Sequence, residues 1–430
     1  MTKDCLKTFM KKNNLFLSKN RLLFFFTFGF SKGITFLGPL LLADILSEED
    51  FGVLEYALAG VGMLVNSMID LGASGGYPYV VLKNKDKKIA KGFVLHGIWL
   101  NLFFLINQLL YFQEIYFFEI YMSLNISYVI SNQLFYASKL KTHDKINSSA
   151  ILNSGIYIVL FVFILGAFTD LFEVNVKSIG TGIFCYAILL FSYNILQFIK
   201  VQKKGLLKAY YQILKFSIHI LVSSILLFAI TVSGRILVEY FFDFNQVAVY
   251  GFYFRLAAIS VMIYQVVAIM FFKKIYTSAP NILDKYFTYF FLSLLILSFI
   301  LDFTAPFIVP YFSDFYVNTS QENSNLFTIL IFQMIMWIST ALNSNIIDRE
   351  KLSQKNNYRL LALFIIGLGL LAYLRNSLSV ESLTFVIYSF FFLTTLTQYF
   401  TLSKEKIFFK KSIITIVVIY FISVVYIYLI

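Results

Sequence analysis

Long apolar stretches separated by short polar segments run along almost the whole chain. Windows of about 20 apolar residues, each long enough to cross a ~30 Å hydrocarbon layer as a helix, recur from Leu22 to Ile430. The strict alternation of apolar and polar residues that a membrane β-barrel needs is missing. The pattern predicts an all-α polytopic membrane protein with twelve or thirteen transmembrane helices. The predicted spans are 22–43, 51–81, 92–112, 115–138, 149–169, 179–199, 216–242, 247–272, 286–310, 324–346, 360–374, 382–402 and 412–430.

Composition agrees with this class of protein. Hydrophobic residues make up 59% of the 430 residues, charged residues only 13%, and the mean hydropathy is +0.78. A chain of this size with so few polar residues cannot cover a water-soluble surface. We therefore expect an integral membrane protein, whose direct surroundings are membrane lipids.

Charge alternates between the connecting segments in step with the predicted spans. Every second segment is basic, and these segments together hold 30 of the 35 Lys and Arg residues. They are 1–21, 83–91, 139–145, 200–215, 273–285, 347–359 and 403–411. The other segments are acidic, as in "DILSEEDFGVLE" at 44–55, and contain only Lys177 and Arg375 as basic residues. By the positive-inside rule the basic side is cytoplasmic.

The N-terminus is predicted to lie in the cytoplasm. The first span follows the basic stretch "MTKDCLKTFMKKNNLFLSKNR" and has no small-residue cleavage site, so we expect a retained helix. The net charge of +12 is explained by this topology, and no nucleic-acid partner is expected. A thirteenth span would place the C-terminus outside.

Signals for enzymatic chemistry are missing from the sequence. Cys5 and Cys185 are far apart, the three histidines are scattered, and no nucleophile elbow, phosphate-binding loop or zinc motif occurs. The predicted loops are about 5 to 16 residues long and leave no room for a soluble catalytic domain. We expect neither an enzyme nor a metal site.

A weak internal repeat links two segments 196 residues apart. In both "LSEEDFGVLEYALA" (46–59) and "FFDFNQVAVYGFYF" (241–254), a short acidic turn is followed by a helix that begins at the equivalent position. Six predicted spans separate equivalent points, so both copies face the same way. Parallel six-helix repeats are a known arrangement in transporters.

These segments also carry a resemblance to a protein family. "LADILSEEDFGVLEYALAGVGMLVNSMIDLGASGG" resembles the first two helices of polysaccharide repeat-unit flippases of the Wzx (O-antigen flippase) type. "GRILVEYFFDFNQVAVYGFYFRLA" is similar to the seventh and eighth helices of that family, with Gly234 in place of the usual Asp before Arg235. The resemblance follows the order of the spans over most of the chain, although its motifs are loose. The wider group that the chain resembles is the multidrug/oligosaccharidyl-lipid/polysaccharide exporter superfamily.

The resemblance implies a fold and a function. It implies two six-helix lobes around a central cleft, residues 1–199 and 200–402, with residues 403–430 as an extra C-terminal helix. The implied function is translocation of undecaprenyl-diphosphate-linked oligosaccharide, as in O-antigen, lipopolysaccharide or capsule synthesis, from the cytoplasmic to the outer leaflet by alternating access. No bound cofactor is implied, although H⁺ or Na⁺ can supply the driving force, and the implied protein partners are a polysaccharide polymerase and a chain-length regulator.

Three basic residues lie inside predicted spans. They are Lys32, Arg235 and Arg255. Inserting a cation at the centre of a membrane helix costs ~2.5–3.5 kcal/mol, so such a residue is expected to bind a ligand or to pair with an acid. Lys32 lies ~16–18 Å from either end of its span, close to the midplane, where snorkelling to the surface is the alternative to a role in the cleft. We predict that all three contact the cargo diphosphate, since arginine can bond two phosphate oxygens at once.

Two acidic residues are candidates for coupling. Glu239 lies four residues after Arg235 on one helix face, as an internal ion pair or as a proton carrier. Asp70 precedes the helix-breaking run "LGASGG", either as a structural cap at a kink or as a site for the coupling ion. Neutral polar residues concentrate in spans three to five, where they can bind sugar hydroxyls or join helices. They are Asn101, Asn107, Gln108, Asn125, Asn132, Gln133 and Asn153.

Two other functions stay open at this point. A multidrug antiporter would share the fold but would favour cationic cargo, which buried cations oppose. A polytopic polysaccharide polymerase or ligase usually has a long basic outer loop, whereas the longest outer segment, 311–323, has no Lys or Arg.

Overall fold

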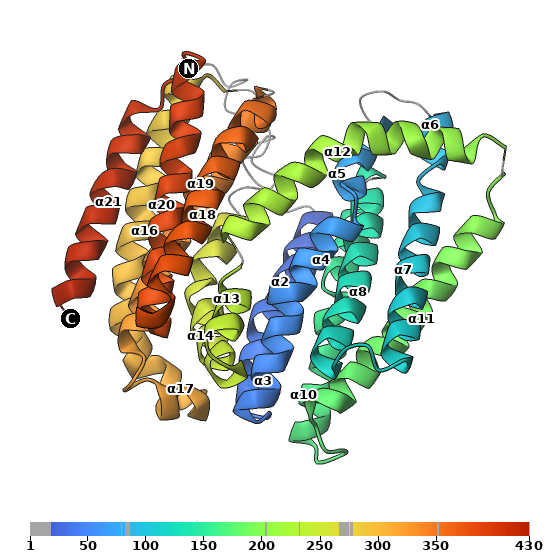
Figure 1. The fold of residues 1–430 in the computed structure, drawn as a ribbon, viewed down its shortest axis with the longest axis horizontal. Helices are drawn as coiled ribbons and strands as arrows, with labels where there is room; N and C mark the ends of the chain where they lie inside the picture. Colours follow the sequence, from blue (N-terminus) through green and yellow to red (C-terminus); the bar gives the residue numbers. More distant parts are fainter. Residues whose placement is uncertain are drawn as a thin grey trace, which may run out of the picture.

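The computed structural model of the chain is mainly helical, and the part that it describes has no β-strands (Figure 1). It describes residues 19–78, 80–81, 87–143, 145–202, 204–231, 233–265, 275, 278–350 and 352–429. Helices cross the molecule side by side and are joined by short turns (Figure 1). The predicted all-α polytopic membrane fold is confirmed.

The first part of the chain forms a group of helices that we call the N-terminal lobe. Its elements are α2 (Lys19–Ala43), α3 (Glu48–Glu55), the π-helix η2 (Tyr56–Gly60), α4 (Val61–Ile69), α5 (Ala73–Pro78), α6 (Lys87–Lys91), α7 (Val94–Phe112), α8 (Phe118–Thr142), α9 (Ile146–Asn153), α10 (Gly155–Phe168) and α11 (Val176–Ile199). α8 is the central helix, and it packs on α4, α5, α7, α9 and α11.

The second part forms a separate group beside it, which we call the C-terminal lobe (Figure 1). Its elements are α13 (Gly234–Phe241), α14 (Phe244–Ala257), α16 (Pro280–Ile308), the 3₁₀ turn η4 (Val309–Tyr311), α17 (Asp314–Thr319), α18 (Ser324–Arg349), α19 (Ser353–Leu374), the 3₁₀ turn η5 (Arg375–Ser377), α20 (Val380–Lys404) and α21 (Lys410–Leu429). α18 is the central helix here, packed on α14, α16, α20 and α21.

A bent helix, α12 (Leu206–Thr231), connects the two lobes, with an angle of 49° between its segments Leu206–Lys215 and Ile220–Ile230. It lies across the upper end of the molecule in Figure 1 and packs on α4, α5 and α6 of the N-terminal lobe and on α19 and α20 of the C-terminal lobe. The predicted seventh span, 216–242, is therefore divided between α12 and α13, and Arg235 lies on the short helix α13. Both helices are apolar, so the hydropathy pattern alone does not reveal the break between them.

Most predicted spans correspond to helices that can cross a membrane. In the described residues nine helices are long and apolar enough, or up to twelve if three bent pairs each count as one span. α8 is not among them, although its 25 residues match the predicted fourth span. α8 is enclosed by protein, so its Asn, Gln and Ser side chains contact other helices and not lipid. A helix in this position can therefore be polar.

The predicted thirteenth span exists as a helix. α21 passes the length and hydropathy test for a membrane span and packs on α16 and α18. The Asp284 carboxylate of α16 accepts hydrogen bonds from the backbone N–H groups of Lys411 (3.1 Å) and Ser412 (2.8 Å), which fixes the start of α21. α21 is thus an integrated part of the C-terminal lobe.

Charged residues separate between the two ends of the helices. We call them the α3 end, where α3 and α14 begin, and the α5 end, where α5 and α6 lie (Figure 1). Described turns at the α3 end carry acids such as Asp44, Glu114 and Asp170, and those at the α5 end carry lysines such as Lys200 and Lys404. The basic segment 1–21 lies mostly outside the described residues, as do parts of 83–91 and 273–285.

Candidate functional site

The two segments of the internal repeat meet each other at the α3 end, one from each lobe. Ser47 caps α3 by accepting from the Asp50 backbone N–H (3.2 Å), and Asp243, 196 residues later, caps α14 by accepting from Gln246 (2.8 Å). The helices cross so closely that a Cβ on Gly52 would lie 1.8 Å from the Phe244 carbonyl oxygen. Only glycine permits this approach.

Three charged side chains are buried at this crossing, and we call them the interlobe triad: Glu55, Arg235 and Arg255. Glu55 of α3 is fully buried, Arg235 is 2% exposed and Arg255 of α14 is 7% exposed. The Nε atom of Arg235 donates to Glu55 Oε2 at 2.8 Å, and Arg255 Nε donates to Glu55 Oε1. One carboxylate from the N-terminal lobe therefore bridges two guanidinium groups of the C-terminal lobe.

Glycine and aromatic residues shape the surroundings of the triad. Gly251 of α14 leaves space for Glu55, since a Cβ there would lie 2.7 Å from Glu55 Cγ. The Arg235 guanidinium lies over the Phe254 ring, 4.6 Å from its centroid, and the Tyr157 side chain of α10 lies at Arg255. Cation–π contacts of this kind stabilise arginine away from water.

The triad carries a net charge of +1, because two arginines share one glutamate. Buried ions are stable only when paired and fully hydrogen-bonded. Yet Arg255 Nη2 is buried without a hydrogen-bond partner in the part of the chain that the structure describes. The site can therefore accept a further anionic or hydrogen-bond-accepting group.

Glu239 does not form the predicted ion pair. Arg235 pairs with Glu55, while the half-buried Glu239 carboxylate lies near the Tyr56 hydroxyl. The spacing of four residues places Arg235 and Glu239 on one face of α13, but the fully buried carboxylate of α3 is the stronger partner, because water does not compete for it. Glu239 joins the lobes through Tyr56 and not through Arg235.

Glu55 was missed because it was counted among the acids of an outer segment. It is the last residue of α3 and continues into η2 without a break. A signal was available in the sequence. Glu55 lies four residues after Phe51, past the acidic first turn of α3, on the buried face that Phe51 and Leu54 share.

Lys32 lies in the N-terminal lobe, half-buried on α2. Its Nζ atom is 5.9 Å from the centroid of the Phe28 ring, and it is close enough to Lys141 of α8 for the two ammonium groups to repel each other. The neighbouring Ser31 donates to the carbonyl oxygen of Ala150 at 2.9 Å. Lys32 thus has a second cation, Lys141, in its surroundings.

A run of polar residues lies between the triad and Lys32. Tyr157 lies at Arg255 and follows Ser154, the N-cap of α10, by three residues. The Ser31 and Ser154 hydroxyls are 2.9 Å apart, and Ser31 precedes Lys32 in the chain. Polar side chains of α10 and α2 thus lie along the way from Arg255 to Lys32.

Asp70 lies at the opposite end of α4 from the triad. It accepts from the Ser74 hydroxyl (2.5 Å) and backbone N–H (3.3 Å), across a turn in which Leu71 and Gly72 have φ angles of 51° and 70°. This geometry is that of a cap at a kink, the first of the two interpretations drawn from the sequence. Asp70 therefore ends α4 and holds the turn that leads into α5.

Several polar residues of spans three to five bond one another. Asn194 Nδ2 donates to Asn101 Oδ1 and to Asn132 Oδ1, each at 2.8 Å, while the hydroxyls of Tyr128 and Tyr136 donate to Asn101 and Asn194. We call these five residues the amide network. Because they satisfy one another between α7, α8 and α11, they join helices and are not free to bind sugar.

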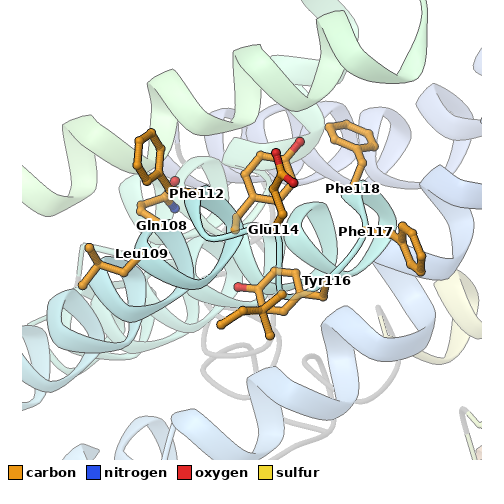
Figure 2. Close-up of a pocket in the computed structure, with 9 residues that line it drawn as sticks. Gln108, Leu109, Phe112, Glu114, Tyr116, Phe117 and Phe118 are labelled. Carbon is orange, nitrogen blue, oxygen red and sulfur yellow. The ribbon is translucent and has the colours of Figure 1, made fainter.

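A surface hollow of about 940 Å³ lies at the turn between α7 and α8. Figure 2 shows its aromatic side chains around this turn, with Gln108 and Glu114 among them. Phe112 and Phe117 are 88% and 82% exposed. Exposed aromatic residues at helix ends are typical of a membrane interface. Gln108, one of the neutral polar residues predicted to bind sugar or join helices, lines this hollow, whereas Lys32, Arg235, Arg255, Glu239 and Asp70 do not.

Comparison with known proteins does not add a family. No protein-family model matches the chain, and no curated protein matches it. Among the described residues, no group of three or more His, Cys, Asp or Glu residues could hold a metal ion. Function must therefore be inferred from the residues and their arrangement.

Proposed function

We propose that the protein is a flippase that moves undecaprenyl-diphosphate-linked oligosaccharide across a bacterial inner membrane by alternating access. The observation that carries this proposal is the interlobe triad, a buried site of net positive charge formed by both lobes. A diphosphate supplies the anionic oxygens that such a site lacks. The sequence resemblance to Wzx flippases points to the same cargo.

The proposed orientation places the α5 end in the cytoplasm and the α3 end outside. The basic turns at the α5 end and the acidic turns at the α3 end support it. Reporter fusions after Lys88, Lys204 and Lys406 should then read cytoplasmic, and fusions after Glu49, Glu119 and Glu322 external. An external signal at Lys204 would contradict the two-lobe topology.

In the proposed cycle, the cargo diphosphate meets Lys32 and Lys141 first and is then handed along the polar run to Arg255. There its oxygens bind the free Nη2 of Arg255 and displace Glu55. Loss of Glu55 from the arginines removes the ionic contact between α3 and α14, so the lobes separate at the α3 end. Arginine suits this exchange because its planar fork can hold either a carboxylate or a phosphate.

Deletion of the gene tests the function directly. Lipid-linked oligosaccharide should accumulate and surface polysaccharide should decrease, as measured by lipid extraction and glycan analysis. Normal surface glycan together with new drug sensitivity would instead indicate a multidrug exporter. Normal glycan and normal drug tolerance would contradict both functions.

Single substitutions test the site. Lys32→Ala, Arg235→Ala and Arg255→Ala should each reduce surface glycan at near-normal protein abundance, and Arg255→Lys should not restore it, because an ammonium cannot make the two-pronged bond. Lys177→Ala, at an exposed lysine of α11, is the matched control. Full glycan in all three alanine variants would exclude the anion site.

A further inference from the structure

A second group of buried titratable side chains lies outside the triad, at the α5 end. It consists of Asp70 at the end of α4, His96 of α7 and Tyr210 of α12. His96 is fully buried and Asp70 is 9% exposed. The capping role of Asp70 uses Ser74 alone and does not explain why a histidine faces it.

The histidine has one bonded and one unbonded nitrogen. His96 Nδ1 lies 3.3 Å from the Tyr210 hydroxyl, while Nε2 lies 3.9 Å from Asp70 Oδ1 and has no hydrogen-bond partner in the described residues. A buried polar atom without a partner is costly, and so is a buried carboxylate without a cation. When the single proton of the neutral ring is on Nδ1, toward Tyr210, an added proton between Asp70 and His96 Nε2 removes both costs as the gap closes by ~1 Å to hydrogen-bond length.

Among the side chains that the structure describes, few other charges surround this pair. The described titratable group of α12 that faces it is Tyr210, and from α8 the His96 ring is covered by Phe135, with centroids 5.1 Å apart. From α5 the nearest titratable group is Tyr77, whose hydroxyl is engaged with His143 (3.2 Å). The charge state of the pair is thus set by protons that Asp70 and His96 take up themselves.

The pair is mechanically connected to both lobes through α12. Tyr210 holds His96, and the turn after Asp70 is pressed against the same helix, since a Cβ on Gly72 would lie 2.5 Å from the Ser217 carbonyl oxygen. On its other side α12 contacts the C-terminal lobe, where Asn357 of α19 donates to Ser223 at 2.9 Å. A shift of Asp70 toward His96 would therefore move α12 against α19.

We propose that Asp70 and His96 form a proton-binding site whose occupancy controls the position of α12 between the lobes. One proton from solution binds between Asp70 Oδ1 and His96 Nε2, closes the gap and draws α4 toward α7. Its release restores the present spacing. Use of this proton to drive cargo transport rests on the proposed flippase function, whereas proton binding and the movement of α12 do not.

Trp99 offers a probe beside this site. Its Nε1 donates to the carbonyl oxygen of Ile69, adjacent to Asp70, at 2.9 Å. The chain has two tryptophans, so Trp337→Phe leaves Trp99 as the single emitter. In this background, Trp99 fluorescence of the purified protein should titrate with pH between roughly 4 and 8, the range of carboxyl and imidazole groups.

The variants decide whether this titration belongs to the pair. Asp70→Asn should abolish it, and His96→Gln should abolish it or move its midpoint by at least about one pH unit, since a neighbouring charge shifts a pKa by that much. Asp302→Asn is the control, because Asp302 is also hydrogen-bonded between helices, by Thr328 and Tyr426, but lies in the C-terminal lobe. An unchanged midpoint in either test variant would overturn the proposal. A midpoint that shifts when Na⁺ replaces K⁺ would also overturn it, because it would indicate a sodium site.

A second readout covers variants that fold poorly and needs no cargo. Spin labels at exposed Lys200 and Lys404, one in each lobe at the α5 end, should report an interlobe distance that changes with pH in an otherwise wild-type protein. The change should be lost in Tyr210→Phe, which removes only the hydroxyl that holds His96. A distance independent of pH would overturn the proposal even if flippase activity were established, and a pH-dependent distance would support it even if deletion left glycans normal.

Discussion

The interlobe triad and the amide network are both buried polar clusters, but they differ in charge and in place. The amide network is neutral and lies within one lobe, and its donors and acceptors are matched to one another. The triad is charged, joins two lobes and leaves Arg255 Nη2 without a hydrogen-bond partner among the described residues. The neutral network fits a part that stays rigid, and the charged one fits a contact that breaks and reforms with an anion.

Removing the central carboxylate should have the largest effect. Glu55→Ala leaves two buried guanidinium groups without a counter-ion, so we expect a loss of about 3–5 kcal/mol in stability or a separation of the lobes at the α3 end. Thermal unfolding in detergent and spin-label distances across α3 and α14 measure the two outcomes. Glu49→Ala, at an exposed position of the same helix, should change neither. An unchanged distance and melting temperature in Glu55→Ala would contradict the role of the triad.

Separating α3 from α14 without changing charge should act less strongly. The Cβ of Gly52→Ala would meet backbone at 1.8 Å, so the helices must move apart, at a cost of about 1–3 kcal/mol. The same substitution at Gly33 is the control, because an added Cβ there meets no atom of the described residues within 4 Å. If both alanine variants melt alike, the close crossing is not what holds the lobes together.

Breaking the amide network should lower stability but leave the lobe distance unchanged. Asn194→Ala removes the partner of Asn101, Asn132 and Tyr136, and buried hydrogen bonds in membrane proteins are each worth about 0.6 kcal/mol, so we expect a loss of about 1–2 kcal/mol. Thermal unfolding and the α3–α14 distance are measured together. Leu189→Ala, at an exposed position of α11, is the control. A changed interlobe distance would remove the distinction between the two clusters.

The smallest effect is expected at Gln333 on α18. It is buried beside Tyr250, but neither amide atom makes a hydrogen bond of ordinary geometry in the described part. Gln333→Leu removes two unsatisfied polar atoms and keeps a similar volume, so stability should stay within about 1 kcal/mol of wild type or rise. A loss as large as that of Asn194→Ala would mean that α18 has a polar network of its own.

Parts of the site were predictable from sequence, and parts were not. Arg235, Arg255 and Lys32 stood out because a cation in an apolar span is rare and costly. Their partners did not, since Glu55 is 180 residues from Arg235 and 200 from Arg255 in the chain. His96 did not stand out for the same reason, because neither Asp70 nor Tyr210 is its neighbour in sequence.

The sequence by itself determined where the helices run and how their ends differ in charge. A lipid-facing helix must be apolar over about 20 residues whatever it packs against, and basic turns stay on one side of a membrane. Tertiary structure alone decided that α3 and α14 cross at Gly52, that α12 spans both lobes and that Glu55 takes both arginines. Such choices depend on which surfaces fit at ångström distances, and the sequence does not show that Glu55 pairs with an arginine 180 residues away.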